Sequence, residues 1–198
     1  DFSAQGMDLP AGLNRLLVLG QRQGGDGWLG AHTGGVAQLA MPFVPPSQRQ
    51  LSLDVFTTAG NGRAQQTSHI EIDGTLVGSR MIGSVLYVVS AWTPDVGIYQ
   101  APANSTPAQA SAVLAAMGTA DLLPRIRVDG AAAQPLVSEP DCYVQPANKS
   151  VALDITVITV IDLKTADMPR TSRCFAGGTQ ALYMSRDNLY LATTRFGF

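Results

Sequence analysis

Apolar and polar residues alternate along short segments of this chain, and turn residues separate the segments. Neighbouring side chains of a β-strand point to opposite faces, so this alternation predicts strands. Joints such as Asp73-Gly74 and Gly83-Ser84 are typical of tight turns between antiparallel strands. Within residues 51–92 the pattern predicts four strands, at Leu51–Thr58, Gln65–Ile72, Leu76–Ile82 and Val85–Trp92.

A second group of four segments follows in the same order within residues 151–195. Leu53-Asp54-Val55 recurs as Leu153-Asp154-Ile155, and Leu86-Tyr87 recurs as Leu189-Tyr190. Both ends of the unit therefore repeat together, and a repeated unit of four short strands is typical of a propeller blade. The strands of this second unit are predicted at Val151–Leu163, Thr171–Phe175, Ala181–Ser185 and Asn188–Thr194.

The Leu-Tyr strand has a weaker third copy at Arg15–Gly20. The pattern of residues 13–50 therefore predicts one N-terminal strand followed by a glycine-rich loop. We expect an all-β, β-propeller-like fold with about two four-stranded antiparallel blades plus this extra N-terminal strand.

Residues 93–150 lie between the two units and have a different pattern, which predicts a helical and loop insertion. Ser105-Thr106-Pro107 is typical of a helix start, Ala108–Met117 is rich in helix formers, and Gly118 suits a helix end. One face of this helix is apolar, so we expect it to pack on a sheet. That face consists of Ala110, Val113, Leu114 and Met117.

Four motifs occur in an order that resembles a known family, at Gly78–Val89, Asp121–Arg125, Asp141–Tyr143 and Tyr183–Ala192. Together they are similar to bacterial secreted proteins with a C-terminal β-propeller domain distantly related to WD40 repeats. The similarity covers most of Leu13–Phe198. The Gly-His and Trp-Asp pairs of true WD40 blades are absent, so WD40 partners are not carried over.

The resemblance implies an exported or cell-envelope propeller and supplies no catalytic residues. The family's propeller is longer than this chain, so we expect a part of a larger propeller. A partial propeller leaves blade edges open, so we expect either self-association through exposed blade edges and faces or a compact packing of two sheets.

Charged residues make up 14% of the 198 residues, while Gly and Pro are frequent. This composition suits a turn-rich secreted or periplasmic protein. The formal net charge of −2 lacks the positive excess that binding to nucleic acid or an anionic membrane needs. The longest apolar run, Val151–Leu163, is too short to cross a bilayer, so we expect no transmembrane segment.

Cys142 and Cys174 are the two cysteines of the chain. In an exported protein they could form a disulfide that stabilises the fold by roughly 3 to 4 kcal/mol through loop entropy. The alternative is two separate buried thiols, because free cysteine behaves as a small apolar residue.

No motif indicates a cofactor, a metal or a catalytic centre. Gly25–Gly30 matches G-x-G-x-x-G, but no helix pattern and no suitably spaced acid follow it. His32, His69 and the two cysteines are too far apart in sequence for the paired ligands of a structural zinc site. A G-x-S-x-G nucleophile motif is absent as well.

Four residues are candidates for contact with a partner. Trp28 and Trp92 stand beside predicted loops, where a large aromatic ring can anchor a partner or cover the edge of the core. Arg80 and Arg186 follow serine at matching places of the two units, which favours bonds to backbone carbonyls or to a neighbouring acid over bonds to a ligand.

We therefore predict a non-enzymatic binding module that recognises a protein, or alternatively a glycan, through loops at one end of the blades. A second hypothesis is a hydrolase whose active site is completed by further blades. A third is a structural domain of the cell envelope.

Overall fold

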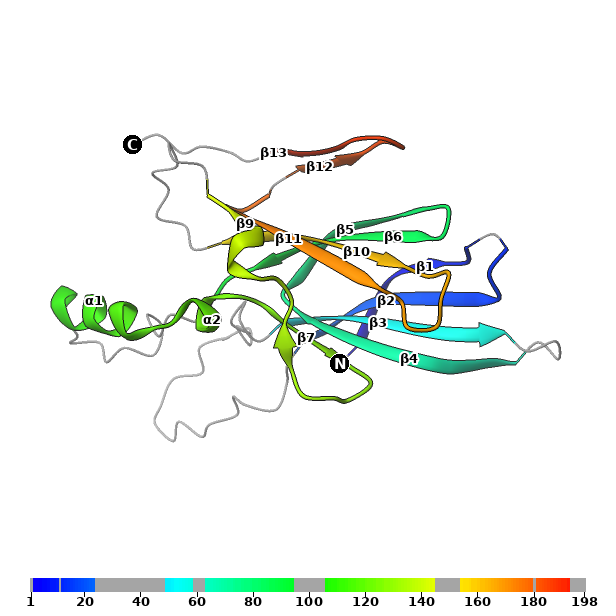
Figure 1. Ribbon diagram of the computed structural model, residues 1–198, viewed down its shortest axis with the longest axis horizontal. Helices are drawn as coiled ribbons and strands as arrows, with labels where there is room; N and C mark the ends of the chain where they lie inside the picture. The colour runs from blue at the N-terminus through cyan, green and yellow to red at the C-terminus, as the bar shows by residue number, and fades with distance from the viewer. Residues whose placement is uncertain are drawn as a thin grey trace, which may run out of the picture.

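The computed structural model describes residues 2–10, 12–23, 49–58, 63–94, 106–144, 154–179 and 181–192. These residues form three β-sheets, two short α-helices and a 3₁₀ turn, so the fold is almost entirely β (Figure 1). The predicted all-β fold class is confirmed.

Sheet A has six strands, each antiparallel to its neighbours, in the order β1-β2-β3-β4-β7-β8. Its strands are β1 (Phe2–Asp8), β2 (Arg15–Gln23), β3 (Arg49–Thr58), β4 (Ala64–Asp73), β7 (Arg125–Val128) and β8 (Gln134–Pro135).

Sheet B has five strands in the order β5-β6-β10-β11-β9. All neighbours are antiparallel except β9 and β11, which are parallel. Its strands are β5 (Thr75–Ile82), β6 (Val85–Trp92), β10 (Ile155–Asp162), β11 (Arg170–Ala176) and β9 (Cys142–Tyr143). The antiparallel hairpin β12 (Ala181–Met184) and β13 (Leu189–Ala192) is sheet C.

The boundaries of the repeated sequence units and the boundaries of the sheets differ by two strands. The unit at 51–92 contributes β3 and β4 to sheet A and β5 and β6 to sheet B. The chain changes sheets at Gly74, whose φ of 115° is accessible to glycine, and a Cβ there would lie 2.5 Å from the Ala91 carbonyl oxygen. Sheet B is therefore built from the last two strands of one unit and the first two of the next, rather than from one whole unit as expected.

The three Leu-Tyr-type strands nevertheless occupy equivalent places, since β2, β6 and β13 are each the second strand of a hairpin. In sheets A and B this strand is an interior strand that pairs on both edges. The repeated pattern thus corresponds to a repeated position in the sheets.

The main hydrophobic core lies between sheets A and B. Alternate residues of β3 and β4 point inward, including Leu53 and Ile70, and meet Val157 and Ile161 of sheet B. Each such side chain contributes about 1.5 to 3 kcal/mol when fully buried. This packing fixes the positions of β10 and β11, which carry one wall of the site described below.

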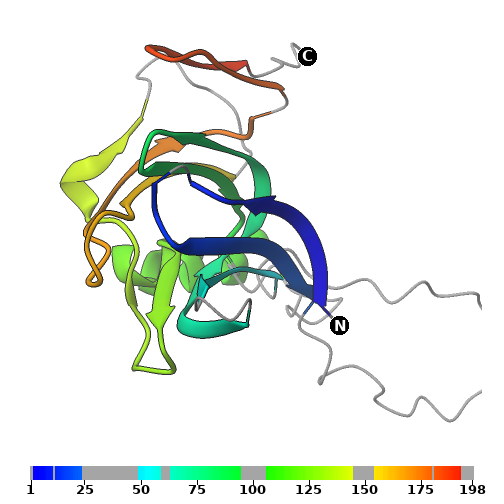
Figure 2. The same ribbon diagram turned by 90° about the vertical axis from the view of Figure 1, so that its right-hand side faces the viewer.

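Sheet C lies on the opposite side of sheet B from sheet A (Figures 1 and 2). Leu182 of β12 packs over Gly78 of β5, where a Cβ would lie 2.7 Å from the leucine Cδ2. Arg80 of β5 donates a hydrogen bond to the carbonyl oxygen of Met184. Sheets A, B and C are therefore packed as three successive layers, as neighbouring blades are in a propeller.

The helices belong to the insertion. Helix α1 (Pro107–Ala116) begins after Thr106, whose hydroxyl accepts a hydrogen bond from the backbone N–H of Gln109. Figure 1 shows α1 projecting beyond the ends of the sheets, whereas the side chains of Ala110, Val113 and Leu114, on which the packing prediction rests, lie outside those that the structure describes. Helix α2 (Thr119–Leu122) follows directly. Neither helix among the residues described has the length and apolar character needed to span a membrane.

Candidate functional site

An open groove of about 660 Å³ lies between β11 and the insertion. One wall is the stretch Arg170–Arg173 of β11, and the other is residues 135–139 with Asp141. Thr119 and Ala120 of α2 also line it. We call this depression the β11 groove.

A disulfide between Cys142 and Cys174 ties the two walls together. The two residues are direct partners in the β9–β11 pairing, with a Cα–Cα distance of 4.4 Å. The sequence left a disulfide and two separate thiols open, and the structure contains the disulfide. It links the insertion covalently to the sheet at the end of the groove.

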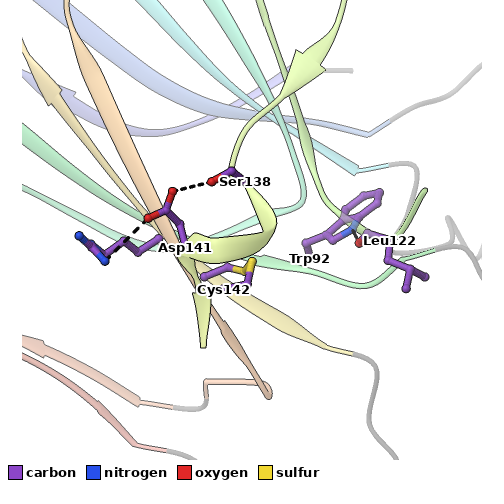
Figure 3. Close-up of a disulfide and its surroundings, with 7 residues drawn as sticks. Trp92, Leu122, Ser138, Asp141 and Cys142 are labelled. Atoms are coloured by element: carbon purple, nitrogen blue, oxygen red, sulfur yellow. Dashed lines mark hydrogen bonds and ion pairs between the residues drawn. A yellow bond between two sulfur atoms is a disulfide. The ribbon is translucent and has the colours of Figure 1, made fainter. Parts of the chain in front are cut away.

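The chain of the insertion reaches β11 through the 3₁₀ turn η2 (Glu139–Asp141), which directly precedes Cys142 of the disulfide. The Ser138 hydroxyl donates to the Asp141 carboxylate at 2.6 Å, and the Asp141 backbone N–H donates to the Ser138 carbonyl at 3.0 Å (Figure 3). Because this turn directs the chain away from the sheet, β9 pairs with β11 only at Cys174 and Phe175. The groove occupies the space beside the rest of β11.

Trp92 binds helix α2, which contributes residues to the lining of the groove. Its indole Nε1 donates to the Leu122 carbonyl at 2.9 Å, and the residue is only 7% exposed (Figure 3). This burial agrees with the alternative that Trp92 covers the edge of the core. The buried ring holds α2 in position where it lines the groove.

The groove carries charges of both signs. Arg173 lies 3.9 Å from the Asp141 carboxylate, donates to the Tyr143 hydroxyl and sits over the Tyr143 ring. Tyr143 in turn stacks on Phe175, with ring centroids 5.4 Å apart. Arg170 and Glu139 are exposed and have no ion pair within the described part of the chain. These two side chains are free to meet charges on a bound molecule.

The other candidate residues lie elsewhere. Arg80 links sheets B and C through the Met184 carbonyl, as the interpretation of a backbone contact expected. Arg186 is exposed in the turn between β12 and β13. Trp28 lies outside the residues that the structure describes.

A second polar cluster covers the face of sheet A that points away from the core. Cross-strand pairing places Asp54 of β3 opposite His69 of β4, and their Oδ1 and Nδ1 atoms are 2.5 Å apart. The other ring nitrogen of His69 lies 3.3 Å from Glu71, which also binds Arg127 at 3.1 Å. Arg22 lies 3.6 Å from Glu71. We call Asp54, His69, Glu71, Arg127 and Arg22 the sheet A cluster.

Charge is balanced within the sheet A cluster. Burial by itself raises the pKa of Glu71, but hydrogen bonds from Arg127 and His69 outweigh it and hold that pKa below its ordinary value. Both nitrogens of His69 face carboxylate oxygens, Nδ1 that of Asp54 and Nε2 that of Glu71. The residues that the structure describes contain no group of His, Cys, Asp and Glu side chains able to hold a metal ion.

Sequence reasoning missed both sites in part. It considered His69 only as a zinc ligand, although Asp54 and His69 occupy outward positions of two adjacent predicted strands. Counting residues across the Gly60-Asn61-Gly62 turn would have placed Asp54 opposite Ser68, because the register shifts by one residue between Val55 and Phe56. The β11 groove has no local signal either, because it depends on the long-range pairing of β9 with β11.

A family model described as a beta propeller domain matches residues 13–196. No curated protein and no solved structure matches the chain. The repeated strands, the stacked sheets and this match agree with one another. The chain belongs to the beta propeller domain family.

Proposed function

We propose that this propeller module is exported to the cell envelope or secreted, and that it binds another protein through the β11 groove. The observation that carries the proposal is the construction of the groove, because the insertion that forms one wall is locked to β11 by the Cys142–Cys174 disulfide. Binding sites commonly lie on connecting segments that a rigid scaffold positions. A wall held in place before binding lowers the conformational entropy lost on association.

The charges of the groove favour a protein partner. Arg170 and Arg173 stand on one wall and Glu139 and Asp141 on the other, so the groove presents both signs within a short distance. A nucleic acid site would need an excess of cations, which neither this groove nor the net charge of −2 provides. A polypeptide can supply complementary charges of both signs.

The exposed aromatic pair beside the groove also supports the proposal. Tyr143 is 47% exposed although it stacks on Phe175, and Val144 is exposed next to it. Aromatic residues are enriched at protein interfaces, where a partner covers them.

The disulfide supports the proposed location. Disulfides persist in oxidising compartments such as the periplasm and the cell exterior, and reducing systems of the cytosol keep thiols free.

Site-specific photocrosslinking tests the proposal. A benzoylphenylalanine placed at Glu139, on the groove wall, is compared with the same probe at Gln65, which is exposed on β4 of sheet A. Both variants are illuminated with proteins of the source envelope. We expect a discrete protein adduct with the Glu139 probe that excess unlabelled chain suppresses, and no such adduct with the Gln65 probe.

Three results would contradict the proposal. Equal adducts at both positions would mean non-specific contact. Adducts made only with a second copy of this chain would favour self-association. An adduct carrying glycan alone would favour the glycan hypothesis.

A further inference from the structure

The β11 groove runs along an unpaired strand edge. On one side, β11 pairs with β10 from Arg170 to Phe175. On the other side it pairs with β9 only at Cys174 and Phe175. The stretch Arg170–Arg173 therefore has no strand on its outer edge in the part of the chain that the structure describes, and this same stretch lines the groove.

The hydrogen-bond phase of β10 and β11 shows which backbone groups face the groove. The Asp162 N–H donates to the Pro169 carbonyl at 2.9 Å, and the Gly177 N–H donates to the Asp154 carbonyl at 2.7 Å. Hydrogen-bonded pairs alternate along an antiparallel ladder, so these two bonds fix the phase of the residues between them. Thr171 and Arg173 consequently direct their backbone groups toward β10, whereas Arg170 and Ser172 direct theirs outward, into the groove.

We propose that an extended segment of the partner protein pairs with the β11 edge at Arg170–Arg173 and adds a strand to sheet B. This inference rests on the proposed function and specifies how the partner binds. Strand addition satisfies backbone N–H and C=O groups of an edge, and alternate side chains of the added strand give specificity. Four residues of strand span roughly 13 Å at about 3.3 Å per residue.

The lining of the groove defines the chemistry of the segment. Arg170 pairs with Ile161, which is buried between sheets A and B, so Arg170 belongs to the core-facing side of β11. Within the wall formed by residues 135–139, Leu136 and Val137 belong to the same core and are 8% and 4% exposed, so this part of the wall is the apolar floor of the groove. A matching segment carries an apolar side chain toward this floor and an acidic side chain toward Arg170, two positions apart in the added strand.

A peptide experiment tests strand addition directly. Fluorescein-labelled hexapeptides with an apolar residue at the third position and an acidic residue at the fifth are titrated with the full chain, and binding is followed by fluorescence anisotropy. The tightest peptide is then N-methylated at one backbone nitrogen at a time. Losing one backbone hydrogen bond and leaving its acceptor unpaired weakens binding by roughly tenfold. We expect this loss at every second position and little change between, because only alternate N–H groups face β11.

A protein variant gives an independent reading. Ser172→Pro removes the outward N–H of Ser172 while the bonds of Thr171 and Arg173 to β10 stay available. Ala132→Pro, in the exposed loop between β7 and β8, is the matched control. We expect Ser172→Pro to weaken peptide binding roughly tenfold and Ala132→Pro to leave it unchanged. Circular dichroism checks that each variant is folded, and the N-methyl series decides the question if Ser172→Pro is not.

The outcomes separate the two proposals. Uniform effects along the N-methyl series, unchanged binding by a folded Ser172→Pro variant, or no binding by any hexapeptide would each overturn strand addition. None of these results would remove a partner adduct at Glu139, which is the test of the proposed function. Loss of that adduct would overturn the proposed function itself.

Discussion

The sheet A cluster and the β11 groove both gather charged residues on the surface of a sheet, but they differ in what those residues contact. In the cluster, His69 lies between Asp54 and Glu71, and Glu71 also binds Arg127. In the groove, Arg170 and Glu139 have no ion pair among the described residues, and the backbone of Ser172 faces open space beside the strand. Side chains that satisfy one another stabilise the fold, whereas groups left unsatisfied at a rigid surface are available to a partner.

The difference has a structural origin. The cluster stands on the middle of paired strands, where cross-strand neighbours are close enough to bind one another. The groove lies where η2 interrupts the extended chain that precedes β9. As a result, β9 lies beside β11 only at Cys174 and Phe175. Four predictions test this contrast, from the largest expected effect to the smallest.

The disulfide should contribute both to the stability of the fold and to partner binding at the β11 groove. Replacing both Cys142 and Cys174 by Ala removes the bond that ties the insertion to β11. We expect the free energy of unfolding to fall by about 3 kcal/mol, and the partner adduct at Glu139 to disappear. Urea unfolding measures the first effect and crosslinking the second. The His69 ring signals in an NMR spectrum should stay unchanged, and a change there would mean that the two regions are coupled.

The indole of Trp92 should stabilise the part of the groove that α2 lines. Trp92→Phe removes the hydrogen bond to the Leu122 carbonyl, and we expect a loss of about 1 to 2 kcal/mol in unfolding free energy together with weaker peptide binding. Tyr190→Phe is the control, because Tyr190 is 59% exposed and its change should stay within about 0.5 kcal/mol. Peptide binding by Trp92→Phe at wild-type strength would show that the groove does not depend on this support.

The sheet A cluster should make stability depend on pH. The pKa of Glu71 is lowered in the folded state, so its ionised form stabilises the fold above the ordinary glutamate value near 4.3, and this contribution is lost as the pH falls through the lowered pKa. We expect Glu71→Gln to cost about 0.5 to 1 kcal/mol at pH 7 and almost nothing at pH 2. Urea unfolding at the two pH values measures this difference.

Glu139→Gln is the matched control for that experiment, because Glu139 is exposed in the groove and has no ion pair in the part of the chain described. The free energy of unfolding of the Glu139→Gln variant should equal that of the wild type at both pH values. A pH dependence as large as that of Glu71→Gln would remove the contrast between satisfied and unsatisfied charges.

The smallest contrast, about 0.5 kcal/mol, is expected between the two arginines of the repeated Ser-Arg pair. Arg80→Ala removes the hydrogen bond to the Met184 carbonyl that joins sheets B and C, with an expected cost of about 1 kcal/mol. Arg186→Ala, at the equivalent position of the second unit, should change stability by less than about 0.5 kcal/mol, because Arg186 is exposed in a turn. Equal costs for the two variants would contradict the assignment of the interlayer bond to Arg80.

Local patterns were sufficient to predict most of the strands. The alternation in Leu51–Thr58 and the turn at Gly83-Ser84 correspond to β3 and to the β5–β6 hairpin. The assignment of strands to sheets failed at Asp73-Gly74, because a two-residue turn between two strand patterns looks the same whether the strands pair or enter different sheets. Only the packing of the apolar faces decides between the two arrangements.

The candidate site was less predictable. The pairing of Cys142 with Cys174 and the contact of Trp92 with Leu122 join residues far apart in sequence, and single-sequence patterns carry no record of such contacts. The insertion at 93–150 was predicted as helix and loop, and the short strands β8 and β9 within it were not predicted because two residues carry no strand pattern. The unpaired edge of β11 follows from the shortness of β9, a property of the folded chain.

Backbone amide exchange in the free chain tests the central claim most directly. NMR measures the rates of four consecutive residues of β11, Arg170, Thr171, Ser172 and Arg173. The unpaired edge predicts that the Arg170 and Ser172 amides exchange at least about tenfold faster than those of Thr171 and Arg173, which bond to β10. Equal protection of all four amides would show that the edge is already occupied, and would contradict the account of the β11 groove as a binding site.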